Sequence, residues 1–171
     1  IVASGPNTAN PHAVPSDRVI EKGDFVLMDY GAGYCDYRSD MTRTVVMGEP
    51  TQEQLDLYAL VRRTHEECVA AIHPGVEGND IFKLSKKIIG DAGYGDYYNH
   101  GLGHGVGIDI HELPNFNRSK NIIEVGSVIT MEPGVYLPGV GGVRLEDYGV
   151  VTENGYEPFT KTPHDLHVID C

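Results

Sequence analysis

The sequence predicts an α+β domain with strands in two hairpins and two helices between them. The first observation is strand-like patterning over residues 23–47 and 127–152, each interrupted by a glycine-containing turn. The second is a pair of apolar stripes at helical spacing within residues 51–92. The third is a short sequence that both hairpins share. At 171 residues, the chain is long enough for one domain with a sizeable core.

The two hairpins are defined by runs rich in β-branched and aromatic residues. In the first, Gly23–Asp29 is predicted as a strand, Gly31–Asp36 as the turn and Tyr37–Met47 as the returning strand. In the second, Ser127–Tyr136 is expected to pair with Val143–Thr152.

Two helices are predicted between the hairpins. Thr51 and Gln54 have the spacing of a capping box, and apolar residues from Leu55 to Ile72 then form a helical stripe. Cys68 lies on this stripe and is expected in the core. A second helix is expected from about Asn79 to Ala92, where Gly93 ends it.

A histidine-rich stretch, Tyr98–Pro114, follows the second helix. It holds His100, His104 and His111, separated by glycines, and Gly107–Ile110 is predicted as a strand. Glycines at this spacing allow a close backbone approach to a bound group. A dinucleotide-binding loop is excluded because no helix follows the glycines. An exposed glycine-rich loop is the alternative to a functional site.

The hairpins repeat part of each other's sequence. Ile20–Gly31 aligns without gaps on Ile123–Gly134, and five of the twelve positions are identical. His12 also echoes His111 upstream of each hairpin. The pattern indicates two structural halves that bring histidines and acidic hairpins to one centre, with a chance similarity of short strands as the alternative. Since only the second half is preceded by helices, we expect the matching helices of the first half on a missing segment.

Composition excludes several classes of function. The formal charge of −12 argues against nucleic acid or an anionic membrane as a partner, and no apolar run has membrane-spanning length. Three widely spaced cysteines without a CxxC pair argue against a disulfide framework or a thiolate zinc site. No signal peptide pattern is present at the N-terminus. A cytoplasmic protein in a reducing compartment is the resulting expectation.

Acidic residues face each other in both predicted hairpins. If the first turn is centred on residues 34–35, Asp29 lies opposite Asp40 on one face of the sheet. The second hairpin, paired about its own glycine turn, places Glu132 opposite Glu146. Facing carboxylates repel each other, so two such pairs are unfavourable unless a cation lies between them.

Together with His104, these four carboxylates form a ligand set suited to two divalent metal ions. The set is chemically hard and fits Mn²⁺, Co²⁺ or Zn²⁺. Bridging carboxylates can hold two ions about 3.5–4 Å apart, and such a centre lowers the pKa of bound water from 15.7 to about 7. The sequence therefore predicts hydrolytic chemistry.

At this point a family resemblance is clear. The chain resembles the creatinase/methionine aminopeptidase-like "pita-bread" metallopeptidases, in particular the Xaa-Pro dipeptidase (prolidase) and aminopeptidase P branch. The resemblance rests on motifs in the family's order: Asn10-Pro-His12, Met28-Asp29-Tyr-Gly31, Ser39-Asp40-Met-Thr-Arg43-Thr44, His100-Gly-Leu-Gly-His104, His111-Glu-Leu-Pro114, Met131-Glu132-Pro-Gly134 and Val143-Arg144-Leu-Glu146-Asp147.

The resemblance implies a pita-bread fold, with pseudo-symmetric α/β halves around a curved antiparallel sheet. Residues 1–171 would be the C-terminal catalytic domain, without the N-terminal helices of the first half and without a separate N-terminal domain. We therefore expect this chain alone to be weakly active or inactive.

The resemblance also implies the role of each metal-binding residue. Asp29, Asp40, His104, Glu132 and Glu146 would hold two divalent ions, most favourably Mn²⁺, with Co²⁺ or Zn²⁺ as alternatives. Asp40 and Glu146 would bridge the ions. Glu132 would also be the general base, assisting a metal-bridging hydroxide in its attack on the peptide carbonyl.

Other residues are expected to contact the substrate. His111 and His12 would stabilise the tetrahedral intermediate or bind the carboxyl end of the substrate. His100 would form a hydrogen bond with the substrate. Each of the three could instead be a structural histidine near the ligands. Arg144 would orient a bridging carboxylate or bind the substrate carboxylate, and Tyr136 would line the pocket or belong to the core.

Residues outside these roles are expected to be structural or exposed. Arg43 is expected to form a structural ion pair. The remaining histidines match none of the motifs and are expected at the surface: His65, His73, His164 and His167.

The implied function is a dinuclear-metal exopeptidase that cleaves the bond before proline, acting on peptides with proline at the second position. One alternative is another activity of the same fold, creatinase or methionine aminopeptidase. A second is a peptide-binding module without catalysis. The family pattern also allows a homodimer.

Overall fold

The computed structural model describes residues 1–170, so Cys171 lies outside the described residues. Within residues 1–170, two α-helices and two short 3-10 helices accompany thirteen strands. The elements in chain order are β1 (Val2–Ser4), a 3-10 helix (Gly5–Ala9), β2 (Phe25–Tyr30), β3 (Gly33–Tyr34), β4 (Tyr37–Arg38), β5 (Met41–Met47), α1 (Gln52–Ala70), α2 (Gly78–Asp91), a 3-10 helix (Gly95–Tyr97), β6 (Gly103–Gly105), β7 (Glu112–Phe116), β8 (Val128–Met131), β9 (Gly134–Leu137), β10 (Gly141–Arg144), β11 (Asp147–Thr152), β12 (Gly155–Pro158) and β13 (His167–Ile169).

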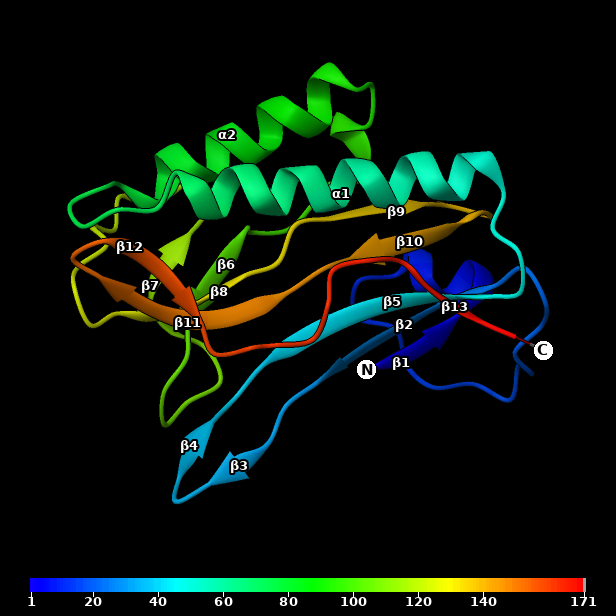
Figure 1. Ribbon diagram of the computed structural model, residues 1–171, viewed down its shortest axis with the longest axis horizontal. Coiled ribbons are helices and arrows are strands. Elements are labelled where there is room, and N and C mark those ends of the chain that lie inside the picture. The colour runs from blue at the N-terminus through cyan, green and yellow to red at the C-terminus, as the bar shows by residue number, and fades with distance from the viewer. Residues whose placement is uncertain (171) are drawn as a thin grey trace.

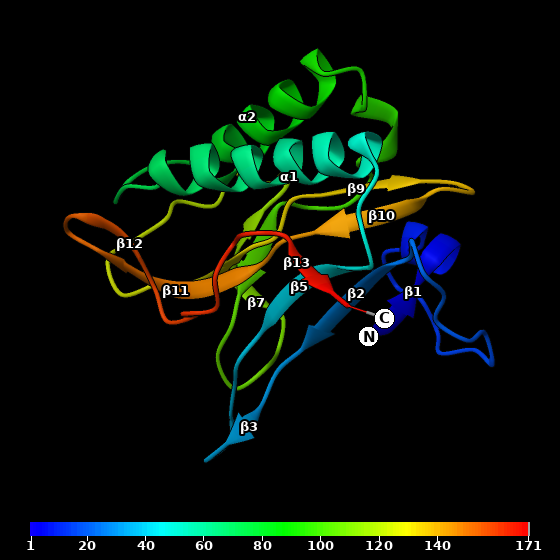
Figure 2. The ribbon, with the colours of Figure 1, turned by 45° about the vertical axis from the view of Figure 1, so that its right-hand side comes forward.

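The strands form two main sheets that meet near the centre of the molecule. The order of the first is β1-β2-β5-β13, and the order of the second is β12-β11-β8-β6-β7. β13 runs parallel to β5, whereas β2 and β5 are antiparallel. Helices α1 and α2 lie on the same side of the strands (Figure 1). The tip of the first hairpin, β3–β4, extends away from the helices (Figure 2).

The register of the first hairpin differs from the prediction. Asp29 pairs with Thr42, so the prediction that Asp29 lies directly opposite Asp40 is wrong. The turn is centred one residue later than expected, on Cys35 and Asp36, which have φ angles of 47° and 68°. Left-handed geometry at both central residues suits a tight hairpin turn. The shift moves the partner by two residues, so Asp29 and Asp40 remain on the same face of the hairpin.

The second hairpin has the predicted register, but each of its strands is divided. Gly134 pairs with Arg144 and Met131 pairs with Asp147, which brackets Glu132 and Glu146 as opposite residues. The break on one side falls at Glu132 and Pro133, where proline cannot donate a ladder hydrogen bond. β8 and β11 therefore belong to the second main sheet, while β9 and β10 form a separate pair.

The prediction of a strand at Gly107–Ile110 is wrong. These residues form a bend in which the Gly107 amide donates to the Asp109 carbonyl over 3.1 Å, and the strand lies earlier, at β6. β6 needs its glycines because its backbone runs very close to its neighbours. A Cβ atom at Gly103 would lie 2.2 Å from the Thr130 carbonyl oxygen, and one at Gly105 would lie 2.4 Å from that of Leu113.

Helix α1 carries the main core against the strands. Its predicted capping box is confirmed, with the Thr51 hydroxyl accepting from the Gln54 amide and the Gln54 side chain accepting from the Thr51 amide. Leu57 packs against strand residues in one core cluster. Cys68 belongs to a second core cluster, so its predicted place in the core is confirmed. Burial of each such apolar side chain contributes about 1.5–3 kcal/mol. Neither α-helix of residues 1–170 combines the length and apolar content needed to cross a membrane.

The same helix buries a histidine that the sequence places at the surface. His65 is only 2% exposed, so that prediction is wrong for His65. Cys68 lies three residues after His65 on α1 and is fully buried. Residues three apart share one face of a helix, so His65 also points into the core. His73 and His167 are exposed, as predicted, and His164 is half-buried.

Candidate metal centre

The predicted ligands converge where the two main sheets meet. Asp29 comes from β2, Asp40 from the residue before β5, and His104 from β6. Glu132 and Glu146 come from the two breaks in the second hairpin. The junction is held by a β-bridge between Thr42 and Glu146, whose backbone groups exchange hydrogen bonds of 3.1 and 3.4 Å.

His104 presents one ring nitrogen to the carboxylates. Its Nδ1 lies 3.0 Å from the Gly105 carbonyl oxygen, which fixes the proton on Nδ1 and leaves a lone pair on Nε2. Nε2 lies 3.4 Å from Glu132 Oε1 and 3.8 Å from Asp40 Oδ2. Ligand atoms of Asp40, His104 and Glu146 all lie within 4.8 Å of one another. This spacing allows one ion to contact all three side chains.

Glu146 supplies a direct test of whether a cation fits. Its side chain is 2% exposed, and its Oε2 accepts a 2.7 Å hydrogen bond from the Thr42 hydroxyl. Its Oε1 is buried and has no hydrogen-bond partner within residues 1–170. A buried acceptor without a partner costs about 1–3 kcal/mol, and more when it is charged. A divalent cation at this point would satisfy it.

The carboxylates also raise one another's pKa. Burial, followed by repulsion from Asp29, raises the pKa of Asp40 to about 6. Burial raises the pKa of Glu132 to about 8, because the attraction of Arg144 only partly offsets burial and the repulsion from Asp40 and Asp29. Burial and the charge of Glu132 raise the pKa of Glu146 well above its usual value. Such a cluster becomes fully ionised at neutral pH only when a cation neutralises it.

Arg144 anchors one of these carboxylates. The guanidinium is 3% exposed and donates to the Asp29 carboxylate through Nη2. Its Nη1 donates to the Tyr136 hydroxyl over 3.0 Å and its Nε to the Thr42 hydroxyl over 3.1 Å. All three nitrogens therefore bind protein groups. Arg144 therefore contacts Asp29, a predicted ligand that is not one of the two expected bridging carboxylates.

Tyr136 and His100 continue this hydrogen-bond chain. Tyr136 is 3% exposed, and its hydroxyl lies 2.8 Å from His100 Nε2. His100 Nδ1 lies 2.7 Å from the Gly101 carbonyl oxygen, so Nδ1 donates and Nε2 accepts from the tyrosine. Burial lowers the pKa of His100 to about 4, which keeps the ring neutral. The chain from His100 through Tyr136 and Arg144 ends on Asp29.

A cavity of about 650 Å³ opens over the centre. It is lined by all five predicted ligands and by four of the five other predicted site residues, with Tyr136 as the exception: Asp29, Asp40, His104, Glu132, Glu146, His12, His100, His111 and Arg144. The rings of His104 and His111 are in edge contact, with centroids 4.3 Å apart. Tyr136 lies behind the wall of the cavity.

Two threonines of the site were not predicted. The Thr42 hydroxyl lies between Arg144 and Glu146, and it accepts from the first and donates to the second. The Thr130 hydroxyl accepts from the His104 amide over 3.1 Å. Thr42 lies within one of the quoted motifs, which was the only available signal. Nothing in the local sequence around Thr130 distinguishes it from an ordinary strand residue.

Comparison with known proteins identifies the family of this chain. The model of Metallopeptidase family M24 matches residues 1–153. The chain belongs to metallopeptidase family M24. An Xaa-Pro dipeptidase of Pyrococcus furiosus is 46% identical to this M24 chain over 167 residues, which are 97% of the chain and 48% of the relative. An uncharacterized peptidase of Bacillus subtilis is 45% identical over 170 residues, 99% of the chain and 48% of that relative.

Solved structures of relatives share the fold of this M24 chain. An X-Pro aminopeptidase from Thermotoga maritima, 37% identical, superimposes with a TM-score of 0.96 over 99% of this chain and 48% of its own. A prolidase from Thermococcus sibiricus, 44% identical, gives a TM-score of 0.96 over 99% of this chain and 46% of its own. The predicted fold class is confirmed. The chain spans about half the length of the curated relatives it matches.

Proposed function

We propose that the protein containing this chain is a dinuclear-metal exopeptidase that cleaves the peptide bond before proline. The observation that carries the proposal is that five candidate ligands line one cavity, and that Oε1 of one of them, Glu146, is buried without a hydrogen-bond partner within residues 1–170. The names of the relatives support the choice of reaction, since one is an Xaa-Pro dipeptidase and another an X-Pro aminopeptidase.

Four carboxylates and one imidazole would hold two divalent ions, and we propose Mn²⁺, with Co²⁺ or Zn²⁺ as alternatives. The residues that would hold the ions are Asp29, Asp40, His104, Glu132 and Glu146, and the family resemblance implies that Asp40 and Glu146 would be shared between them. When bound, the ions would polarise the scissile carbonyl and supply a nucleophilic hydroxide near neutral pH.

Glu132 is proposed to transfer a proton from the attacking water to the leaving proline nitrogen. Its carboxylate faces the cavity and lies 3.4 Å from His104 Nε2. In this position it can accept the proton of the attacking water. It can then return that proton to the proline nitrogen, which must be protonated to leave as an amine. Glu132 would thus serve as base first and as acid second.

His12 and His111 are proposed to contact the substrate. Both line the cavity, and neither ring has a hydrogen-bond partner within residues 1–170. Ring N–H groups there could donate to the developing oxyanion or to the carboxylate of the substrate. His100 differs because both of its nitrogens are engaged, so its main proposed role is to position Tyr136, Arg144 and Asp29.

The test uses the whole protein loaded with Mn²⁺. An Xaa-Pro dipeptide and an Xaa-Pro-Yaa tripeptide are incubated separately, and products are quantified by chromatography. We expect release of proline from the first, of the N-terminal residue from the second, or both. Failure to cut either peptide would contradict the proposal. Absence of bound metal at saturating Mn²⁺ would favour a peptide-binding module instead.

The same assay separates the other activities of this fold. Release of methionine from a peptide without proline would indicate a methionine aminopeptidase, and turnover of creatine would indicate a creatinase. The tripeptide-to-dipeptide rate ratio then decides between aminopeptidase and dipeptidase.

A further inference from the structure

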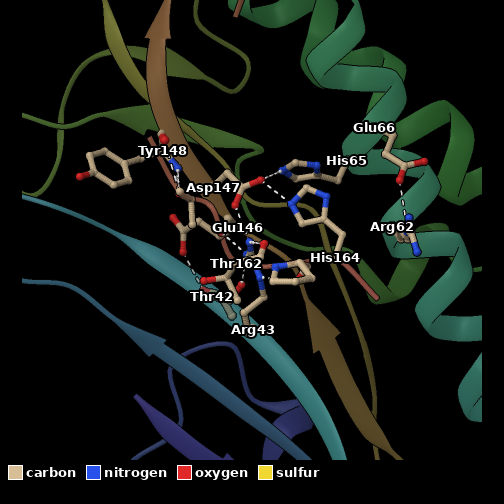
Figure 3. Close-up of polar contacts among 12 residues, drawn as sticks. Thr42, Arg43, Arg62, His65, Glu66, Glu146, Asp147, Tyr148, Thr162 and His164 are labelled. Carbon is tan, nitrogen blue, oxygen red and sulfur yellow. Dashed lines mark hydrogen bonds and ion pairs between the residues drawn. The ribbon is translucent and has the colours of Figure 1, made fainter. Parts of the chain in front are cut away.

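A second group of metal-ligating side chains lies outside the metal centre. It consists of His65, Asp147 and His164, which we call the His65 cluster. His65 lies on α1, Asp147 is the first residue of β11, and His164 belongs to the segment between β12 and β13. Both imidazoles point at the same carboxylate (Figure 3). The three residues are far apart in sequence, and none of them has a role in the proposed peptidase reaction.

The donor atoms of the His65 cluster converge on one point. Nε2 of His164 lies 2.6 Å from Asp147 Oδ2, and Nε2 of His65 lies 3.4 Å from the same oxygen. One ligand atom from each residue lies within 4.8 Å of the other two. The imidazole rings are in edge contact, with centroids 4.9 Å apart.

His65 itself indicates that a ligand belongs here. Its ring is 2% exposed, and neither ring nitrogen has a hydrogen-bond partner within residues 1–170. Buried imidazole nitrogens without partners cost about 1–3 kcal/mol each, whereas an aliphatic side chain would fill the same space without that cost. Burial also lowers the pKa of His65 to about 4, so the ring is neutral and can offer a lone pair.

We propose that the His65 cluster is a site for one divalent cation, with Zn²⁺ as the preferred ion. Two imidazoles and one carboxylate are a ligand set that zinc accepts, and water can complete the tetrahedron. Ligand atoms about 2.0–2.2 Å from zinc lie roughly 3.3 Å apart in a tetrahedron, close to the His65–Asp147 spacing. His164 is half-buried on a segment without regular structure, and it would move back from Asp147 by less than about 1 Å.

Arg43 holds the carboxylate of the His65 cluster in place. Its Nη2 donates to Asp147 Oδ1 over 2.7 Å, which leaves Oδ2 directed at the two histidines. The guanidinium charge opposes a nearby cation. Backbone carbonyl oxygens offset this charge, because Arg43 donates to those of Thr42, Glu146, Thr162 and Pro163. A bound ion would therefore fasten this C-terminal segment to α1 and β11.

The experiment measures zinc stoichiometry in the whole protein after the main centre has been disabled by Asp40→Asn with His104→Ala. We expect one Zn²⁺ per chain in this background. Addition of His164→Ala should abolish it, whereas His73→Ala, which removes an exposed imidazole, should leave it unchanged. No zinc in the background, or equal zinc with His164→Ala, would overturn the proposal. The result does not depend on peptidase activity.

A second measurement covers the case in which a variant fails to fold. The unmodified protein is labelled with ¹⁵N-histidine and titrated stepwise with Zn²⁺ in the absence of Mn²⁺. NMR spectra are recorded after each addition. We expect the ring nitrogens of His65 and His164 to shift together at a zinc step distinct from that of His104, while His73 stays constant. Unchanged His65 and His164 signals would show that the cluster is only a packed hydrogen-bonding group.

Discussion

Glu132 has two proposed roles, as a metal ligand and as the general base. It is one of the cavity-lining carboxylates, and burial with nearby negative charge raises its pKa to about 8. This pKa belongs to the metal-free cluster, and bound cations would lower it by stabilising the carboxylate. With metal present, Glu132 would be ionised at neutral pH and able to accept the proton of the attacking water.

Replacement of Glu132 by glutamine tests this role. Glu132→Gln keeps the shape of the side chain but cannot accept a proton, so we expect turnover of an Xaa-Pro peptide to fall by about 10²–10⁴-fold. Metal content is measured in the same samples, because the amide is also a weaker ligand. The matched control is Glu153→Gln, an exposed glutamate outside the cavity, which should keep full activity. Activity within a few-fold of the unmodified protein would exclude Glu132 as the base.

Arg144 acts through its neighbours. Lysine cannot reproduce its planar set of donors to Asp29, Tyr136 and Thr42. For Arg144→Lys we expect Mn²⁺ affinity to fall by about 10–100-fold, since Asp29 loses its orientation. Metal titration gives the affinity, and Arg63→Lys, at an exposed helix position, is the control. Unchanged affinity with reduced substrate binding would instead assign Arg144 to the substrate.

Strand β6 depends on glycine for its place between β7 and β8. At Gly103 an added Cβ would meet the Thr130 carbonyl oxygen at 2.2 Å, and Thr130 also holds the amide of His104. Backbone-to-backbone contacts of this kind cannot be relieved by a side-chain rotation. Close packing of β6 is thus tied directly to the position of the nitrogen ligand.

Gly103→Ala should therefore destabilise the protein by about 1–3 kcal/mol and weaken metal binding. Thermal or urea unfolding and metal titration measure the two effects. Gly90→Ala is the matched control, because Gly90 lies in α2 with open space around it. There alanine should stabilise by about 0.5–1 kcal/mol through helix propensity. Equal effects of the two changes would contradict the packing described for β6.

The whole molecule should respond to pH in opposite ways with and without metal. In the metal-free protein, burial and like charge raise the pKa of Glu132 from 4.5 to about 8 and that of Asp40 from 3.8 to about 6. A raised folded-state pKa means that the folded protein binds more protons than the unfolded chain. The stability these groups contribute is present below their unfolded pKa values and is lost as pH rises through about 6 and then about 8.

Thermal unfolding in EDTA should therefore show a falling midpoint between about pH 7 and pH 8.5. Below about pH 6.5 the buried His65 and His100, whose pKa values are lowered to about 4, act in the opposite direction, because the unfolded chain binds more protons there. Saturating Mn²⁺ should reverse the trend, because metal binds the ionised carboxylates and stabilises the folded state. The difference between the two midpoints should be largest at the highest pH. A metal-free midpoint that rises over this range would contradict the carboxylate cluster described above.

Short-range features of the sequence determined most of the elements. The Thr51–Gln54 capping box fixes the start of α1, because its partners are three residues apart. The register of the second hairpin follows from its own turn, which correctly placed Glu132 opposite Glu146. The motifs also located the residues that line the cavity, since each motif is contained within a few positions of the chain.

Tertiary structure alone decided what depends on contacts between distant segments. The closeness of β6 to β8 could not be read from the glycines, and a Gly107–Ile110 strand was expected instead. The burial of His65 arises only when β11 and the segment carrying His164 close over α1. Local spacing encodes hydrogen bonds and periodicity within an element. Local spacing does not specify which charged group, carbonyl group or ring from a distant segment will contact a given side chain. Those tertiary contacts decide whether the side chain is buried, paired or able to bind a metal.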